Sequence, residues 1–278
     1  MGTLTPARFT LATLAYVGVA FAAEPYTGRA GEYAIGLVTW LVLVVACRAL
    51  ARAERGRVAA LVLIACVGEV LGSLVLGLYA YRRGGIPFFV PPGHGLIYLA
   101  GYRLSQVAWM RRHGVRLALA GGGVWAGLGL VLGPRPDVAG AFAMLALFAF
   151  LLRGSQPSLY AAMLVVVAFL EFYGTAIGTW HWQPYWPGTH LPAGNPPSGV
   201  AACYCVFDAL ALRLTAMLKV GDPVAFIRRS HSSTYNSAPR APVRSPMSIT
   251  RSGGQPNSPS RARSSSLAPA SSPAMNTT

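Results

Sequence analysis

Residues 69–81 read EVLGSLVLGLYAY, and residues 171–182 read EFYGTAIGTWHW, nearly the same pattern about a hundred residues later. Each stretch has a Glu, a Gly three residues on, a second Gly about one helical turn later and an aromatic-x-aromatic pair. A Pro-Pro turn follows each one, PPGHG at residues 91–95 and NPPSG at residues 195–199. Both Glu69 and Glu171 lie inside long apolar runs. An ionisable group in a bilayer is costly, so each marks a candidate functional site.

The composition predicts a protein of the cell membrane that crosses it many times. Hydrophobic residues make up 54% of the chain and charged residues only 11%, whereas a soluble domain has about 25% charged residues. The net charge of +15 lies largely in short loops and in the C-terminal region. We interpret it as attraction to anionic lipid headgroups, and we expect no nucleic acid partner.

The fold class we predict is all-α, a polytopic helical membrane protein. A membrane core about 30 Å thick needs roughly 20 helical residues, and eight apolar segments approach that length. Their limits are 8–23, 33–52, 58–81, 87–110, 115–133, 138–153, 158–180 and 197–219. We divide them into two parallel four-helix repeats, residues 1–114 and 115–229. Residues 230–278 are rich in Ser, Pro and Arg and contain no acidic residue, so we expect a disordered basic cytoplasmic tail that contacts anionic headgroups.

Arginine placement predicts the orientation of the chain. The Arg-rich loops fall on one side of the predicted membrane, and this excess marks the cytoplasm. Both termini are then cytoplasmic. The first segment can also be read as a signal peptide, because Ala20-Phe21-Ala22 resembles a cleavage site, but we favour a retained helix. Lys219 is the single Lys among 23 basic residues, which indicates a GC-rich bacterial genome of the actinobacterial kind.

Helical spacing places small residues beside each intramembrane Glu. Glu69 shares a helix face with Gly72, and Glu171 shares one with Gly174, by the i, i+3 rule. A small residue near a buried carboxyl group lets a neighbouring backbone or a ligand approach closely. Plain helix packing explains the glycines equally well, and only their pairing with Glu favours function. A buried Glu can be structural, or it can act as a general acid or base.

Further polar and aromatic residues cluster near the two motifs or within the apolar segments. The candidate catalytic residues are Glu69, Glu171 and Asp208. The candidate substrate-binding residues are Tyr79, Tyr81, His94, Arg103, Trp180, His181, Trp182 and Asn195. Arg103 is a candidate counter-ion for a buried carboxylate. No histidine-rich metal motif, nucleotide loop or serine hydrolase motif occurs, so we expect no metal and no cofactor.

The first motif resembles a known family. Glu69, Gly72, the run Gly77-Leu78-Tyr79-Ala80-Tyr81, then Gly85-Ile86-Pro87 and Val90-Pro91 resemble the core motif of carotenoid biosynthesis membrane proteins that hydrate bisanhydrobacterioruberin-type carotenoids. The resemblance implies a polytopic enzyme without a cofactor that acts on a long polyisoprenoid in the bilayer. The chain departs from the family at His94 and Gly95, where the family tends to have Trp.

Three functions remain open from the sequence. The first is an enzyme that modifies a lipid or isoprenoid in the outer half of the bilayer by hydratase-like acid/base chemistry. The second is a transporter or flippase in which Glu69 and Glu171 carry protons or substrate, as parallel repeats allow. The third is a non-catalytic membrane scaffold. The first two imply membrane lipids and a hydrophobic small molecule as partners.

Overall fold

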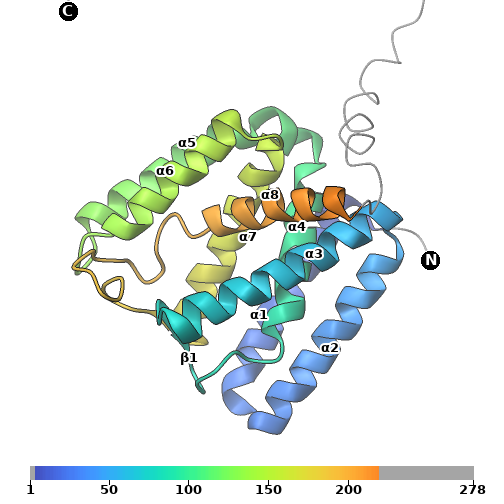
Figure 1. Cartoon of the computed structure of the whole chain (residues 1–278), viewed down its shortest axis with the longest axis horizontal. Coiled ribbons are helices and arrows are strands. Elements are labelled where there is room, and N and C mark those ends of the chain that lie inside the picture. Colours follow the sequence, from blue (N-terminus) through green and yellow to red (C-terminus); the bar gives the residue numbers. More distant parts are fainter. Residues whose placement is uncertain (1–3, 219–278) are drawn as a thin grey trace, which may run out of the picture. The chain divides into compact units, whose positions relative to one another are not determined.

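The computed structural model describes residues 4–218, so the predicted tail, residues 230–278, lies outside the described residues. The described part is mostly helical (Figure 1). Its α-helices are α1 (Pro6–Ala23), α2 (Arg29–Arg48), α3 (Arg52–Glu69), α4 (Val90–Ser105), α5 (Ala108–Val131), α6 (Val138–Arg153), α7 (Pro157–Ala176) and α8 (Ala202–Met217). A 3₁₀ turn (Glu24–Tyr26), a π-helical segment (Val70–Val75) and two strands, β1 (Tyr79–Tyr81) and β2 (Trp180–Trp182), complete it.

Local sequence explains where several helices begin. Thr5 caps α1 by accepting a hydrogen bond from the Arg8 backbone N–H, and Pro6 occupies the first helical position, where no N–H is needed. Glu54 accepts from the Ala51 backbone N–H, 3.0 Å away, at the start of α3. Asp137 caps α6. These contacts satisfy donors that a helix N-terminus leaves unpaired.

Within residues 4–218, five helices are long and apolar enough to cross a membrane. They are Pro6–Tyr26, Arg29–Arg48, Arg52–Val75, Ala108–Val131 and Pro157–Ala176. Helix α6 is apolar but shorter, and α4 and α8, of 16 residues each, extend only about 24 Å. That all eight helices cross the membrane stays a prediction. Large apolar side chains also cover outward-facing helix surfaces, for example Leu37, Leu41 and Val45 on α2, as expected of helices that face lipid.

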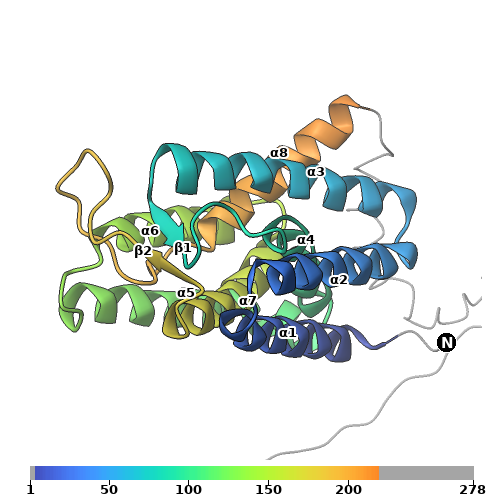
Figure 2. The same cartoon turned by 90° about the horizontal axis from the view of Figure 1, so that it is seen from below.

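Helix α4 lies at the centre of the described helices. It packs against α1, α2, α3 and α7, and Figures 1 and 2 show it surrounded by them. Residues 95–101 of α4 are all buried, which is the pattern of a core helix and not of an amphipathic one. Helix α3 packs along α8, as α4 packs along α7.

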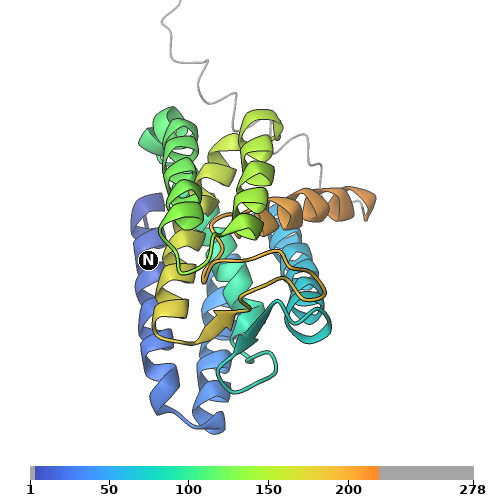
Figure 3. The same cartoon turned by 90° about the vertical axis from the view of Figure 1, so that its left-hand side faces the viewer.

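The two aromatic motifs form a small sheet that the all-α prediction missed. We predicted Tyr79, Tyr81 and Trp180 at the ends of helical segments. Instead β1 and β2 pair antiparallel, and Figure 3 shows the two arrows side by side. Helix α7 and the helical segment after α3 each end before a glycine with positive φ, Gly178 at 71° and Gly77 at 64°. A left-handed glycine is a common helix terminator, and it turns the chain into the strand.

Other helix boundaries also differ from the predicted segments. The predicted segment 87–110 is divided between α4 and α5, because Val107 has an extended backbone conformation. The hydroxyl of Ser105 donates to the Tyr102 carbonyl, 2.7 Å away, and this bond competes with continuation of the helix. The predicted segment 197–219 begins as a turn, and α8 starts only at Ala202.

An ion-pair cluster joins two connecting segments near the sheet. Glu24, which is 2% exposed, accepts a hydrogen bond from Arg82 Nε at 3.0 Å and pairs with Arg83. Arg83 also donates to the Thr27 carbonyl. The segment after β1 is thereby fixed to the α1–α2 connection.

Candidate functional site

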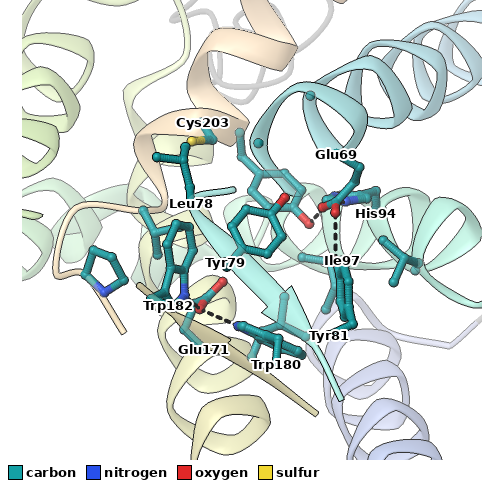
Figure 4. A pocket seen from close by; sticks show the side chains of 18 of the residues that line it. Glu69, Leu78, Tyr79, Tyr81, His94, Ile97, Glu171, Trp180, Trp182 and Cys203 are labelled. Carbon is teal, nitrogen blue, oxygen red and sulfur yellow. Dashed lines mark hydrogen bonds and ion pairs between the residues drawn. The ribbon is translucent and has the colours of Figure 1, made fainter. Parts of the chain in front are cut away.

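Glu69 and Glu171 line the same cavity. Its volume is about 380 Å³, and its surface is mainly apolar and aromatic. Residues of α1, α2, α3, α4, α6, α7, α8 and both strands contribute to it. In the view of Figure 4, Tyr79 lies between the two carboxyl groups. A small number of polar groups in an apolar cavity is typical of a ligand-binding site.

The paired strands place four aromatic side chains at this cavity. Tyr79 lies opposite Trp182, and Tyr81 lies opposite Trp180. The ring centroids of Tyr79 and Trp182 are 4.7 Å apart. Because side chains alternate across a strand, all four of these aromatics lie on one face of the sheet and line the cavity.

Glu69 is held by side chains from two different elements, β1 and α4. The hydroxyl of Tyr81 donates to Glu69 Oε2 at 2.7 Å, and His94 Nε2 lies 2.8 Å from Glu69 Oε1. The other His94 ring nitrogen, Nδ1, lies 2.8 Å from the Tyr204 hydroxyl. With Glu69 ionised, His94 Nε2 donates to the carboxylate, and Nδ1 of the neutral ring accepts from Tyr204. Glu69, His94 and Tyr204 thus form a continuous chain of hydrogen bonds.

Glu171 is held differently, by two indole groups. Trp180 Nε1 donates to Glu171 Oε2 at 3.1 Å, and Trp182 Nε1 donates to the same oxygen at 2.9 Å. Within residues 4–218, Oε1 of Glu171 has no hydrogen-bond partner. The two carboxyl groups therefore have distinct surroundings, and such differences allow one group to serve as acid and the other as base.

The two motifs make equivalent contacts despite these differences. A side chain at Gly72 would meet the ring of Tyr79, and one at Gly174 would meet the ring of Trp180. Each glycine lets the aromatic side chain of its own motif pack directly against the helix. The first motif has one more residue than the second between its Glu and its aromatic pair, and the π-helical segment accommodates it. If the two motifs are related by twofold symmetry, equivalent residues must make equivalent contacts, as Gly72 and Gly174 do.

The tyrosines of β1 remain neutral donors. Burial, and then the negative charge of Glu69, raise the pKa of Tyr79, and burial and Glu69 likewise raise the pKa of Tyr81. Neither hydroxyl therefore ionises near neutral pH. Both are available to hydrogen-bond a carboxylate.

Asp208 lies apart from the cavity, although the sequence grouped it with the two glutamates. Its Oδ1 accepts from Arg57 Nε at 3.0 Å and from the Tyr98 hydroxyl at 2.7 Å. Gln156 Nε2 donates to Oδ2 at 3.1 Å. Asp208 is 1% exposed and Arg57 is 6% exposed. A buried ion pair that joins α3, α4, α8 and the residue before α7 fits a structural role.

Three predicted substrate-binding residues also lie outside the cavity lining. Arg103 lies over the Phe9 ring, 5.8 Å from its centroid, and the counter-ion of the buried Asp208 is Arg57 instead. His181 is exposed on the opposite face of the sheet from its aromatic neighbours. Asn195 Oδ1 accepts from the Trp182 backbone N–H at 3.0 Å, so it holds the edge of β2.

Sequence reasoning missed several buried polar residues. Tyr204 lies between two cysteines in an apolar run and shows no periodic signal. In the sequence, Arg57 is not distinguished from Arg52 and Arg55, the other arginines at the predicted start of a helix. Asp137 is 2% exposed and accepts from the backbone N–H groups of Gly194 and Ser198, both at 2.7 Å. Its position one residue before an apolar run was the available signal, since Asp is favoured at helix N-caps.

Within residues 4–218, no group of three or more His, Cys, Asp or Glu side chains is placed to hold a metal ion. Comparison of the chain with protein-family models, with curated proteins and with solved structures found no match.

Proposed function

We propose that this chain is an integral membrane enzyme that modifies a lipid or isoprenoid by acid/base chemistry at Glu69 and Glu171. One observation carries the proposal. The carboxyl groups of two similar motifs, about a hundred residues apart in the sequence, line a single apolar cavity. Such a cavity suits an apolar substrate, and carboxyl groups are the functional groups that exchange protons with it.

The reaction that fits these groups is addition of water to an alkene. A carboxylic acid protonates one alkene carbon, and the π electron pair forms the new C–H bond. The oxygen of a water molecule then bonds to the cationic carbon, and the proton that this water loses passes to a carboxylate. Aromatic faces next to the cavity stabilise the intermediate cation by cation–π attraction.

The different surroundings of Glu69 and Glu171 suggest which carboxyl group is the base and which is the acid. Tyr81 and His94 both donate to Glu69, which favours its ionised form and the role of base. The hydrogen-bonded chain from Tyr204 through His94 to Glu69 fixes the orientation of this carboxylate. Oε1 of Glu171 has no hydrogen-bond partner in the described part of the chain, and the proton of the acid can reside there.

The substrate class follows from the lining and from the resemblance of the first motif. Leu71 and Leu76 line the cavity and are about half exposed on the outside of their helical segment. This favours entry of the substrate from surrounding lipid and not from water. Resemblance to carotenoid-hydrating membrane proteins supports a polyisoprenoid, with the reacting end in the outer half of the bilayer.

Lipid mass spectrometry tests the proposal. Cells that express the wild-type chain are compared with cells that express Glu69→Gln or Glu171→Gln, which keep the size of each side chain and remove its acid. We expect a lipid heavier by one water in the wild type and a loss of at least about a hundredfold in either variant. The control is Glu32→Gln on α2, a carboxyl group outside the cavity lining, and it should retain activity. Equal lipid profiles in all four strains would overturn the proposal.

A second candidate is a carrier with a twin-glutamate site. The position of one Glu from each motif in a single cavity favours it, because carriers built from repeats place their sites at the repeat interface. A carrier would leave the lipid composition unchanged, and the Gln variants would instead abolish proton-coupled flux.

A further inference from the structure

A second hollow lies between α2 and α3. Its volume is about 580 Å³, and it is open on one side. Helices α2 and α3 each pack against α4, and Leu43 and Val62 meet above Gly95 of α4. These two side chains form the bottom of the groove. Val44 and Leu63, which are exposed, line its sides.

The groove is apolar along most of its length and basic at one end. Its residues are Trp40, Leu43, Val44, Cys47, Arg48, Arg55, Val58, Ala59, Val62, Leu63 and Cys66. Arg48 is the last residue of α2, and Arg55 lies in the first turn of α3. Both arginines are exposed, and both lie at the end predicted to be cytoplasmic. From Trp40 to Arg48, α2 rises about 12 Å.

Among residues 4–218, no acidic side chain forms an ion pair with Arg48 or Arg55 at this basic end. The nearest carboxylate in the sequence, Glu54, is held elsewhere, by the Ala51 backbone N–H and the Tyr102 hydroxyl. No Asp or Glu lines the groove. Two guanidinium groups are thus available to an anion, and Arg binds phosphate oxygens through paired N–H groups.

We propose that this groove binds one anionic membrane phospholipid. Its phosphate lies between Arg48 and Arg55, and one acyl chain follows the apolar groove toward Trp40. Charge complementarity selects an anionic headgroup, and the apolar length beyond the two arginines selects a lipid over a free phosphate. Basic hollows between membrane helices on the cytoplasmic side are known to take such headgroups. The proposal needs only that the helices lie in a membrane, and it does not depend on the reaction proposed above.

Native mass spectrometry of the full chain tests this site. The protein is purified from vesicles that contain equal amounts of phosphatidylglycerol and phosphatidylcholine, and the ratio of the two retained lipids is measured. We expect the wild type to retain phosphatidylglycerol preferentially and Arg48→Gln/Arg55→Gln to lower the ratio about tenfold. The matched control is Arg111→Gln/Arg112→Gln, which removes the same charge from exposed positions at the start of α5.

Two outcomes would overturn the proposal. If both double variants lower the ratio equally, the lipid is attracted by overall charge and not by this groove. If neither changes it, no headgroup lies at Arg48 and Arg55.

A further variant, Ala59→Trp, fills the groove without a change in charge and should also reduce retention of phosphatidylglycerol. Should the double Gln variant fail to fold, Ala59→Trp decides the question alone.

Discussion

Glu69 and Asp208 illustrate how similar side chains acquire different roles. Both are buried, and both accept several hydrogen bonds. Glu69 faces a cavity and is bonded to a histidine, whereas Asp208 is enclosed by Arg57, Tyr98 and Gln156. A carboxylate that already has a permanent cation and no open space cannot exchange a proton with a substrate. We therefore expect Asp208 to matter for stability.

Removal of Asp208 should destabilise the protein strongly. Asp208→Ala leaves the buried Arg57 without its counter-ion, and breaking a buried pair costs about 3–5 kcal/mol. Thermal unfolding in detergent measures this loss. Asp208→Leu combined with Arg57→Met removes both charges and should recover much of it. An Asp208→Ala variant that unfolds at the wild-type temperature but has lost all lipid-modifying activity would contradict our assignment.

At this scale the sequence identified as candidates both glutamates and the side chains bonded to them, which are Tyr81, His94, Trp180 and Trp182. It did not identify Tyr204 or Arg57. Repetition of a motif around a rare acidic residue identified Glu69 and Glu171 as candidates. Nothing near Tyr204 in the sequence indicates that it reaches His94, 110 residues away. Arg57 was read as a loop residue because its burial is decided by α8, which is distant in the chain.

The helical elements were predictable because their cause is local. Each of the eight apolar segments overlaps an α-helix in the described residues, because a long apolar run is visible directly in the sequence. The helix ends were predicted less well. The strands were not predictable in this way. Tyr79–Tyr81 and Trp180–Trp182 are too short to give a period-2 signal, and each finds its partner about a hundred residues away.

A substitution that adds one methyl group tests the contact between α7 and β2. A side chain at Gly174 would overlap the ring of Trp180, so Gly174→Ala must displace the indole from Glu171. We expect a loss of about 1–3 kcal/mol in stability, as for other overpacked sites, together with reduced activity. Thermal unfolding and lipid turnover measure the two effects.

Gly123→Ala on α5 is the matched control for this substitution. Nothing lies within 4 Å of the position that its methyl group would occupy. In a helix interior, Ala is more stable than Gly by up to about 1 kcal/mol, so this variant should be neutral or more stable. Equal unfolding temperatures for the two variants would mean that Trp180 does not pack closely on Gly174.

On the scale of the described molecule, the site is assembled from both predicted repeats. Glu69, Tyr81 and His94 come from the first, and Glu171 and Tyr204 come from the second. Neither half contains a complete set of groups. Duplication of a four-helix unit remains our interpretation of the sequence, and the equivalent contacts of Gly72 and Gly174 support it.

The pairing of β1 with β2 also restricts which motions are open to the chain. A carrier that works by alternating access must part its two halves in each cycle, also at the end that we predict to face outward. The ladder between β1 and β2 ties the two predicted halves together at that end. Ala80 lies directly opposite His181, on the side of the sheet away from the cavity. In a background without the native cysteines, Ala80→Cys/His181→Cys should form a disulfide that locks the halves. An enzyme supplied laterally from lipid should continue to turn over under oxidising conditions, whereas a rocking carrier should stop until a reductant is added.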